Sequence, residues 1–66
     1  MPVVTLEAAK LNYEQKKQLV AEFTETVARI TGLPKTSIFV FLKENSPENI
    51  GVAGQLLTEK KEPVKA

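Results

Sequence analysis

One residue near the start of the chain has unusual chemical potential: Pro2, which directly follows Met1. A small second residue usually lets the initiator methionine be removed, and Pro2 would then begin the chain with a free secondary amine. An α-amino group titrates near neutrality, at about 7.7–8.0, and burial or a nearby cation lowers this pKa because both disfavour the charged form. A neutral amine at working pH can act as a general base. The dipeptide alone is weak evidence, since proline also begins strands that have no chemistry.

The residue types present exclude several other kinds of site. The chain has no Cys and no His, which excludes disulfides, Cys/His zinc sites and Ser/His or Cys/His nucleophile pairs. The eight acidic residues are all glutamates, and their spacing does not match a calcium-binding loop. No glycine-rich phosphate loop is present. The residue types therefore give no support for a zinc site, a calcium loop or a phosphate loop.

Two segments after Met1 indicate the elements that would position Pro2. Residues 2–8 form a nearly continuous apolar run of high β propensity, which predicts a buried strand. From Tyr13 to Thr31, apolar residues recur every three or four positions, as they do in an amphipathic helix. Asn12 and Gln15 form a capping-box pattern at its start, and Gly32 suits its end.

The second half of the chain completes a βαβ unit. Ser37–Lys43 predicts a second strand, again apolar on both faces, and the long helix between the strands makes them parallel neighbours. Residues 50–54 are expected as a short strand or the arm of a hairpin. One helix covers only one face of a two-stranded sheet, so we expect the uncovered apolar face to associate with other copies of the chain. The fold class is therefore α+β.

Size and charge restrict the remaining possibilities. Sixty-six residues make one small domain, residues 1–66, with a flexible tail expected from about residue 59. The net charge is +1, and basic and acidic residues are interspersed, which does not favour nucleic acid as a partner. No apolar run is long enough to span a membrane, and no cleavable signal pattern opens the chain. We expect a cytoplasmic protein whose partner is a small molecule.

The order and spacing of these features resemble the 4-oxalocrotonate tautomerase (2-hydroxymuconate tautomerase) family of the tautomerase superfamily. The resemblance covers about Pro2 to Thr58. Its motifs are Met1-Pro2 before a strand, Asn12-x-Glu14-Gln15-Lys16-Lys17-x-Leu19-Val20 at the start of the helix, Pro34-x-x-Ser37-Ile38-x-Val40, and Pro47-Glu48-Asn49-Ile50-Gly51-Val52-x-Gly54.

The resemblance implies a tautomerase-like (MIF-like) fold of two parallel strands, one long helix and a short C-terminal hairpin. It also implies dimers that pair through their sheets and assemble as a hexamer of three dimers. In such an enzyme Pro2 is the catalytic base, and it moves a proton between the enol hydroxyl and the carbon skeleton of an unsaturated 2-keto acid such as 2-hydroxymuconate. No cofactor takes part, and the implied setting is aromatic catabolism.

The rest of the family's site carries over poorly. Where well-known members have two arginines and an aromatic residue, this chain has Leu11, Phe39 and Ile50. Lys10 is the nearest cation to the first of these positions, and a solvated lysine before a helix explains it equally well. We take Lys10, Phe39 and Ile50 as candidate pocket residues beside Pro2. A substrate less charged than a dicarboxylate, or lysines from adjacent subunits, would then be expected.

Two alternative functions follow from the same residues. A hydratase or dehalogenase of the same fold would use the proline ammonium as an acid, and it would need a carboxylate to activate water. Glu7 and Glu44 are the candidates at the strand ends. The second alternative is a non-catalytic oligomeric binding protein on the same scaffold, which the missing arginines and a retained Met1 would favour.

Overall fold

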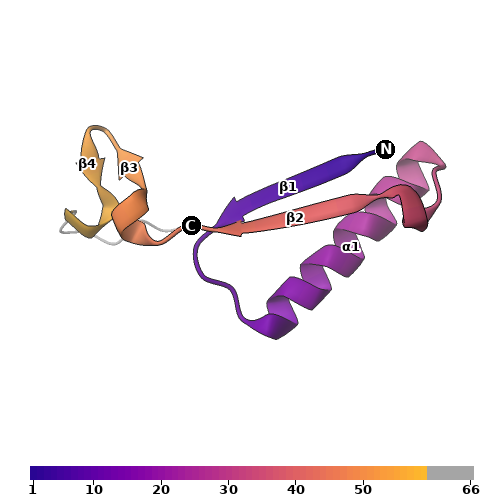
Figure 1. Cartoon of the computed structure of the whole chain (residues 1–66), viewed down its shortest axis with the longest axis horizontal. Helices are drawn as coiled ribbons and strands as arrows, with labels where there is room; N and C mark the ends of the chain where they lie inside the picture. Colours follow the sequence, from indigo (N-terminus) through magenta and orange to yellow (C-terminus); the bar gives the residue numbers. More distant parts are fainter. Residues whose placement is uncertain (60–66) are drawn as a thin grey trace.

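The computed structural model describes residues 1–59, and the basic tail predicted to be flexible lies almost entirely outside them. The predicted βαβ unit is confirmed (Figure 1). It consists of strand β1 (Val3–Ala8), helix α1 (Tyr13–Thr31) and strand β2 (Phe39–Glu44). The two strands are parallel and in register from Val3 beside Phe39 to Ala8 beside Glu44. Within residues 1–59, no helix is long and apolar enough to cross a membrane.

Helix α1 begins and ends where the sequence predicts. The Asn12 side chain accepts a hydrogen bond from the Gln15 backbone N–H (2.8 Å), and the Gln15 side chain accepts one from the Asn12 N–H (3.0 Å). This capping box satisfies two backbone donors that a helix N-terminus otherwise leaves unpaired. Gly32 ends the helix with a φ of 75°, and its N–H donates to the Ala28 carbonyl. A left-handed residue after the last turn is a common helix end, and glycine adopts it at little cost.

The start of the second strand was predicted two residues too early. Ser37 lies in a short 3₁₀ turn, η1 (Lys35–Ser37), and β2 begins at Phe39. The reason is local hydrogen bonding: both the N–H and the hydroxyl of Ser37 donate to the Pro34 carbonyl, at 3.0 and 2.9 Å. Side chains such as serine offer the backbone this alternative to a strand ladder.

The two faces of the sheet differ in burial. Alternate strand residues are half-buried toward α1 or exposed on the opposite face. The exposed face, which we call the open face, carries Val3, Thr5, Glu7, Phe39, Phe41 and Lys43. Ile38, 9 % exposed, is the single buried residue among the described ones. The sequence predicted strands that are buried on both faces, and in a single chain this is wrong. The prediction that one face of the sheet lacks cover within the chain is confirmed.

The helix also buries less than its apolar pattern predicts. Leu19, Phe23 and Val27 are half-buried, but Val20 is exposed and Ile30 is 70 % exposed. Because α1 contacts a sheet of only two strands, the flanks of its apolar stripe extend beyond the sheet. The single chain therefore leaves part of this stripe in water.

A short hairpin follows the sheet as a separate arm. Strands β3 (Gly51–Val52) and β4 (Gln55–Leu56) are antiparallel, and short 3₁₀ turns, η2 (Pro47–Asn49) and η3 (Leu57–Glu59), flank them. Ala53 and Gly54 join the strands with φ angles of 54° and 79°, the pattern of a type I′ turn. In Figure 1 the arm lies beyond the end of β2, away from α1.

Candidate active site

Pro2 lies at the amino edge of the sheet, one residue before β1. Its carbonyl accepts a hydrogen bond from the Phe39 N–H at 3.0 Å, and this bond extends the β1–β2 ladder to Pro2. Pro2 is half-buried, whereas Met1 before it is 84 % exposed. While Met1 is attached, the Pro2 nitrogen belongs to an amide and cannot exchange a proton. Removal of Met1 would leave a secondary amine held in place by the ladder.

Phe39 is the candidate pocket residue that the structure brings next to Pro2. It is paired with Val3 across the sheet, and its ring lies on the open face with 46 % of its surface exposed. The ring therefore gives the amino edge an apolar surface directly beside the proline. The part of the open face nearest to Pro2 consists of Val3, Thr5, Phe39 and Phe41. None of these side chains is charged.

Lys10 lies at the opposite edge of the sheet. It follows the end of β1 and lines a shallow pocket with Glu44, Asn45, Ser46 and Pro47. A strand rises about 3.3 Å per residue, so the six residues of β1 separate this edge from Pro2 by roughly 20 Å. Within one protomer, Lys10 therefore cannot touch a substrate bound at Pro2.

Ile50 is also remote from Pro2 within one chain. It is half-buried in the arm, where its N–H donates to the Pro47 carbonyl and its own carbonyl accepts from Leu57. Because the arm lies beyond the carboxyl edge of the sheet (Figure 1), a single protomer places Pro2 beside Phe39 but leaves Lys10 and Ile50 elsewhere. Any site that unites all four residues would need a second copy of the chain.

The carboxyl edge contains a cluster that the sequence patterns did not indicate. Glu44 accepts a hydrogen bond from the Leu11 N–H at 2.8 Å and forms an ion pair with Lys16, also at 2.8 Å. The hydrogen bond from Lys16, together with the one from Leu11, lowers the pKa of the Glu44 carboxyl from its ordinary value. Lys16 and Glu44 are distant in sequence, so no local spacing could have revealed the pair.

The two glutamates considered as water-activating groups both have structural partners. Glu44 is engaged with Lys16 and Leu11, and Glu7 accepts a hydrogen bond from the Asn45 side chain at 3.3 Å. Both lie near the carboxyl edge, far from Pro2 in the same protomer. A hydratase arrangement is therefore not assembled within one chain.

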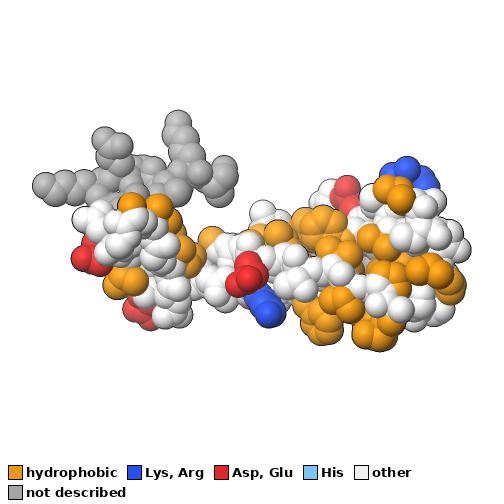
Figure 2. Space-filling view, turned by 90° about the horizontal axis from the view of Figure 1, so that it is seen from above, with side chains coloured by type: hydrophobic (Ala, Val, Ile, Leu, Met, Phe, Trp, Pro, Cys, Tyr) orange, Lys and Arg blue, Asp and Glu red, His pale blue; other side chains and the backbone are white. Residues whose placement is uncertain are grey.

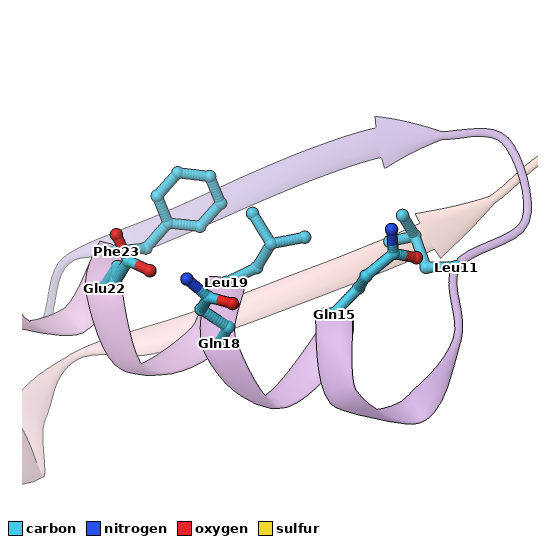
Figure 3. Close-up of a pocket in the computed structure, with 6 residues that line it drawn as sticks. All are labelled: Leu11, Gln15, Gln18, Leu19, Glu22 and Phe23. Carbon is cyan, nitrogen blue, oxygen red and sulfur yellow. The ribbon is translucent and has the colours of Figure 1, made fainter.

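A groove along α1 lies beside the sheet. Figure 3 shows its lining, in which Leu19 and Phe23 point from α1 toward the strands and Gln15, Gln18 and Glu22 occupy its rim. Leu11, before the helix, closes one end. The sequence predicted Leu19 and Phe23 as part of the apolar stripe, but the groove shows that one protomer does not fill the space beside them. Among residues 1–59, no group of three carboxylates is placed to hold a metal ion.

Known proteins resemble this chain over most of its length. The family described as "Tautomerase enzyme" matches residues 2–60. A probable tautomerase of Bacillus cereus is 38 % identical over 61 residues, which cover 91 % of this chain and all of the relative. A probable tautomerase of Staphylococcus aureus is 38 % identical over 55 residues, covering 82 % of this chain and 90 % of that protein.

Solved structures agree with these relatives. The crystal structure of YwhB, a homologue of 4-oxalocrotonate tautomerase, is 34 % identical and superposes with a TM-score of 0.84, covering 91 % of this chain and all of YwhB. DmpI from Archaeoglobus fulgidus is 31 % identical with a TM-score of 0.79, covering 88 % of this chain and all of DmpI. With the family match over residues 2–60, these similarities establish that the chain belongs to the tautomerase family and is an isomerase of the tautomerase type.

Proposed function

We propose that this chain, once Met1 is removed, is a cofactor-independent keto–enol tautomerase of small unsaturated 2-hydroxy or 2-keto acids, with Pro2 as its general base. The observation that carries the proposal is the position of Pro2. Pro2 is half-buried, its carbonyl accepts a hydrogen bond from the Phe39 N–H, and the preceding Met1 is 84 % exposed. Partial burial of the freed amine would favour its neutral form, because desolvation disfavours the charged one.

The proposed reaction uses one proton carrier for two steps. The neutral Pro2 amine accepts the proton of the enol hydroxyl, and the resulting ammonium donates a proton to a carbon of the conjugated chain. The amine returns to its starting state, and the carbonyl and the new C–H bond replace the enol. A base whose pKa lies near the working pH suits both steps, because it is readily protonated and deprotonated.

We propose that the working form is a homo-oligomer, with a hexamer of three dimers as the expected state. One protomer leaves the open face uncovered and keeps Lys10 and Ile50 away from Pro2. Other copies would cover that face, and they would bring a cation and an apolar side chain to the amine. The expected location is the cytoplasm, and aromatic catabolism is the expected setting.

The test is ketonisation of 2-hydroxymuconate by protein whose measured mass confirms loss of Met1. We expect turnover well above the buffer rate and a rise of kcat/KM with pH as the amine loses its proton. Protein that keeps Met1, in which the Pro2 nitrogen is an amide, should lose at least about a hundredfold in kcat, the usual range for a general base. Full activity with Met1 attached would refute the role of the amine.

A second candidate is a non-catalytic binding protein on the same scaffold. The apolar Leu11 and Phe39, which stand where well-known members of the family have arginines, are the observation that favours it. Comparing the tautomerase activity of the protein with and without Met1 distinguishes the two functions. A catalyst should gain activity when Met1 is removed, whereas a binding protein should turn over no enol in either form.

A further inference from the structure

The open face is divided along its strands into an uncharged part and a charged part. Figure 2 shows hydrophobic side chains gathered over the βαβ part of the chain, with charged side chains in separate places. On the open face, the charges belong to one register pair, Glu7 of β1 beside Lys43 of β2. The remaining side chains of this face are uncharged and exposed: Val3, Thr5, Phe39 and Phe41. The face therefore carries both members of an ion pair, which makes it complementary in charge to a second copy of itself.

The two charged groups do not pair with each other within the chain. The Glu7 carboxylate accepts a hydrogen bond from the Asn45 side chain at 3.3 Å, which leaves its charge without a cation. Among residues 1–59, the one ion pair joins Lys16 to Glu44, so Lys43 has no ion-pair partner there. Both Glu7 and Lys43 are exposed. Their charges are therefore accessible to groups outside the chain.

A copy that covers the open face would take these two charges out of water. Burial of a charge is costly unless the charge is paired. Copies that meet in an arbitrary register would set Glu7 or Lys43 against an apolar side chain of the other copy. A register that sets Glu7 of one copy against Lys43 of another pairs both kinds of charge, because every copy contributes one of each. This arrangement is therefore favoured over the others.

From this arrangement we propose that Glu7 of one copy and Lys43 of the next form ion pairs across the open face, and that these pairs fix the register in which the copies associate. The inference rests on the proposed homo-oligomer, and the occupant of the open face is a second copy of this chain. The apolar side chains drive the association by leaving water. The charges select one arrangement among those that the apolar side chains permit.

Cross-linking of the unmodified chain tests the pair directly. A carbodiimide joins a carboxylate to an amine in contact with it, and a denaturing gel then separates joined chains from single chains. We expect the peptide that links Glu7 to Lys43 in the band of joined chains and not in the band of single chains. The internal control is the pair of Lys16 and Glu44, which lie 2.8 Å apart in one chain and should be linked in the band of single chains.

Exchange of the two charges tests whether the pair decides which copies associate. The double variant Glu7→Lys with Lys43→Glu keeps opposite charges, so it should sediment with the mass of the unmodified chain. A co-expressed, tagged unmodified chain should capture this variant at least about tenfold less than it captures an untagged unmodified chain, because like charges would meet at every mixed contact. The control, Glu25→Lys with Arg29→Glu, exchanges charges at exposed positions of α1 and should be captured as well as the unmodified chain.

Two different results would refute two different statements. If the link between Glu7 and Lys43 is absent from joined chains, or if the double variant assembles freely with the unmodified chain, the ion-pair inference is wrong while the homo-oligomer stands. If the unmodified chain sediments as a monomer, the homo-oligomer and the inference fail together, and the open face belongs to a different partner. Turnover of 2-hydroxymuconate by the same preparation tests Pro2 separately. The cross-link decides the inference even if the double variant does not fold.

Discussion

At the scale of single residues, the backbone angles decide which glycine the fold needs. Gly32 has a φ of 75° at the end of α1, and Gly51 does not have a positive φ. A Cβ on Gly32 would meet no atom within 4 Å, and one on Gly51 would meet only the Gln55 carbonyl at 3.7 Å. Because a Cβ would fit at both positions, the two glycines differ only in their backbone conformation.

We therefore expect Gly32→Ala to destabilise the protein by about 1 kcal/mol, because an L-residue with a side chain strains the left-handed region. Gly51→Ala is the matched control and should change the free energy of unfolding by less than about 0.5 kcal/mol. Urea unfolding at one fixed protein concentration measures both values. Equal effects of the two substitutions would contradict the argument.

At the scale of elements, the Glu44 carboxylate joins the start of α1 to the end of β2. It binds the Lys16 ammonium and the Leu11 N–H, both at 2.8 Å. These two contacts hold the loop between β1 and α1 against the end of β2, where the hairpin arm begins. Asn45 adds two contacts at the same place, from its backbone to Ala8 and from its side chain to Glu7.

The pH dependence of stability tests this junction. The pKa of Glu44 is lowered below its ordinary value of 4.5 in the folded chain, mainly by the Lys16 hydrogen bond. A lowered folded-state pKa means that the stabilisation is present above pH 4.5 and is lost as the pH falls through the folded value. Glu44→Gln, which keeps a hydrogen-bond acceptor, should be less stable at pH 7, and the gap to the unmodified chain should close below pH 4.5.

The exposed glutamate Glu48 in η2 supplies the control for that experiment. Glu48→Gln should follow the unmodified chain at every pH, because Glu48 has no ion-pair partner within residues 1–59 and isolated surface charges contribute little to stability. A gap between Glu44→Gln and the unmodified chain that stays constant from pH 7 to pH 3 would show that the charge of Glu44 is not the stabilising feature.

Elements also show how far the sequence predicts this molecule. Helix α1 was predicted with its bounds and its capping box, because each of these signals lies within a few residues of the position it describes. The start of β2 was missed, since the Ser37 bonds to Pro34 compete with the strand. The Lys16–Glu44 pair was missed because it forms only when distant elements meet.

The residues of the candidate site could likewise be predicted only in part. Phe39, Lys10 and Ile50 were all named from the family resemblance. The strand register, which the sequence did not predict, brings Phe39 beside Pro2, whereas one chain holds Lys10 and Ile50 away from Pro2. Their meeting depends on how copies of the chain assemble, and no periodicity within a single sequence encodes that arrangement.

At the scale of the whole molecule, the protomer is too extended to be a stable compact domain. Its radius of gyration is 15.3 Å, and its extents are 45 × 24 × 16 Å, whereas a compact chain of this length has a radius of gyration of about 11 Å. The open face exposes Phe39 and Phe41 by 46 % and 50 %. Large exposed apolar patches of this kind mark interfaces between proteins, which agrees with the proposed homo-oligomer.

Assembly and stability should therefore be inseparable in this protein. We expect the unmodified chain to sediment as an oligomer, with a Tm that rises with protein concentration, because mass action stabilises a folded state that exists only in the assembly. Phe41→Glu places a charge at the centre of the open face, where its burial against another copy would be costly, and it should give a monomer that has lost cooperative unfolding. The control is Tyr13→Glu, which adds the same charge on α1 at a position that is 72 % exposed. This variant should leave the sedimenting mass unchanged.

A monomeric unmodified chain at micromolar concentration, or an oligomeric Phe41→Glu, would show that the open face is not the surface through which the copies associate.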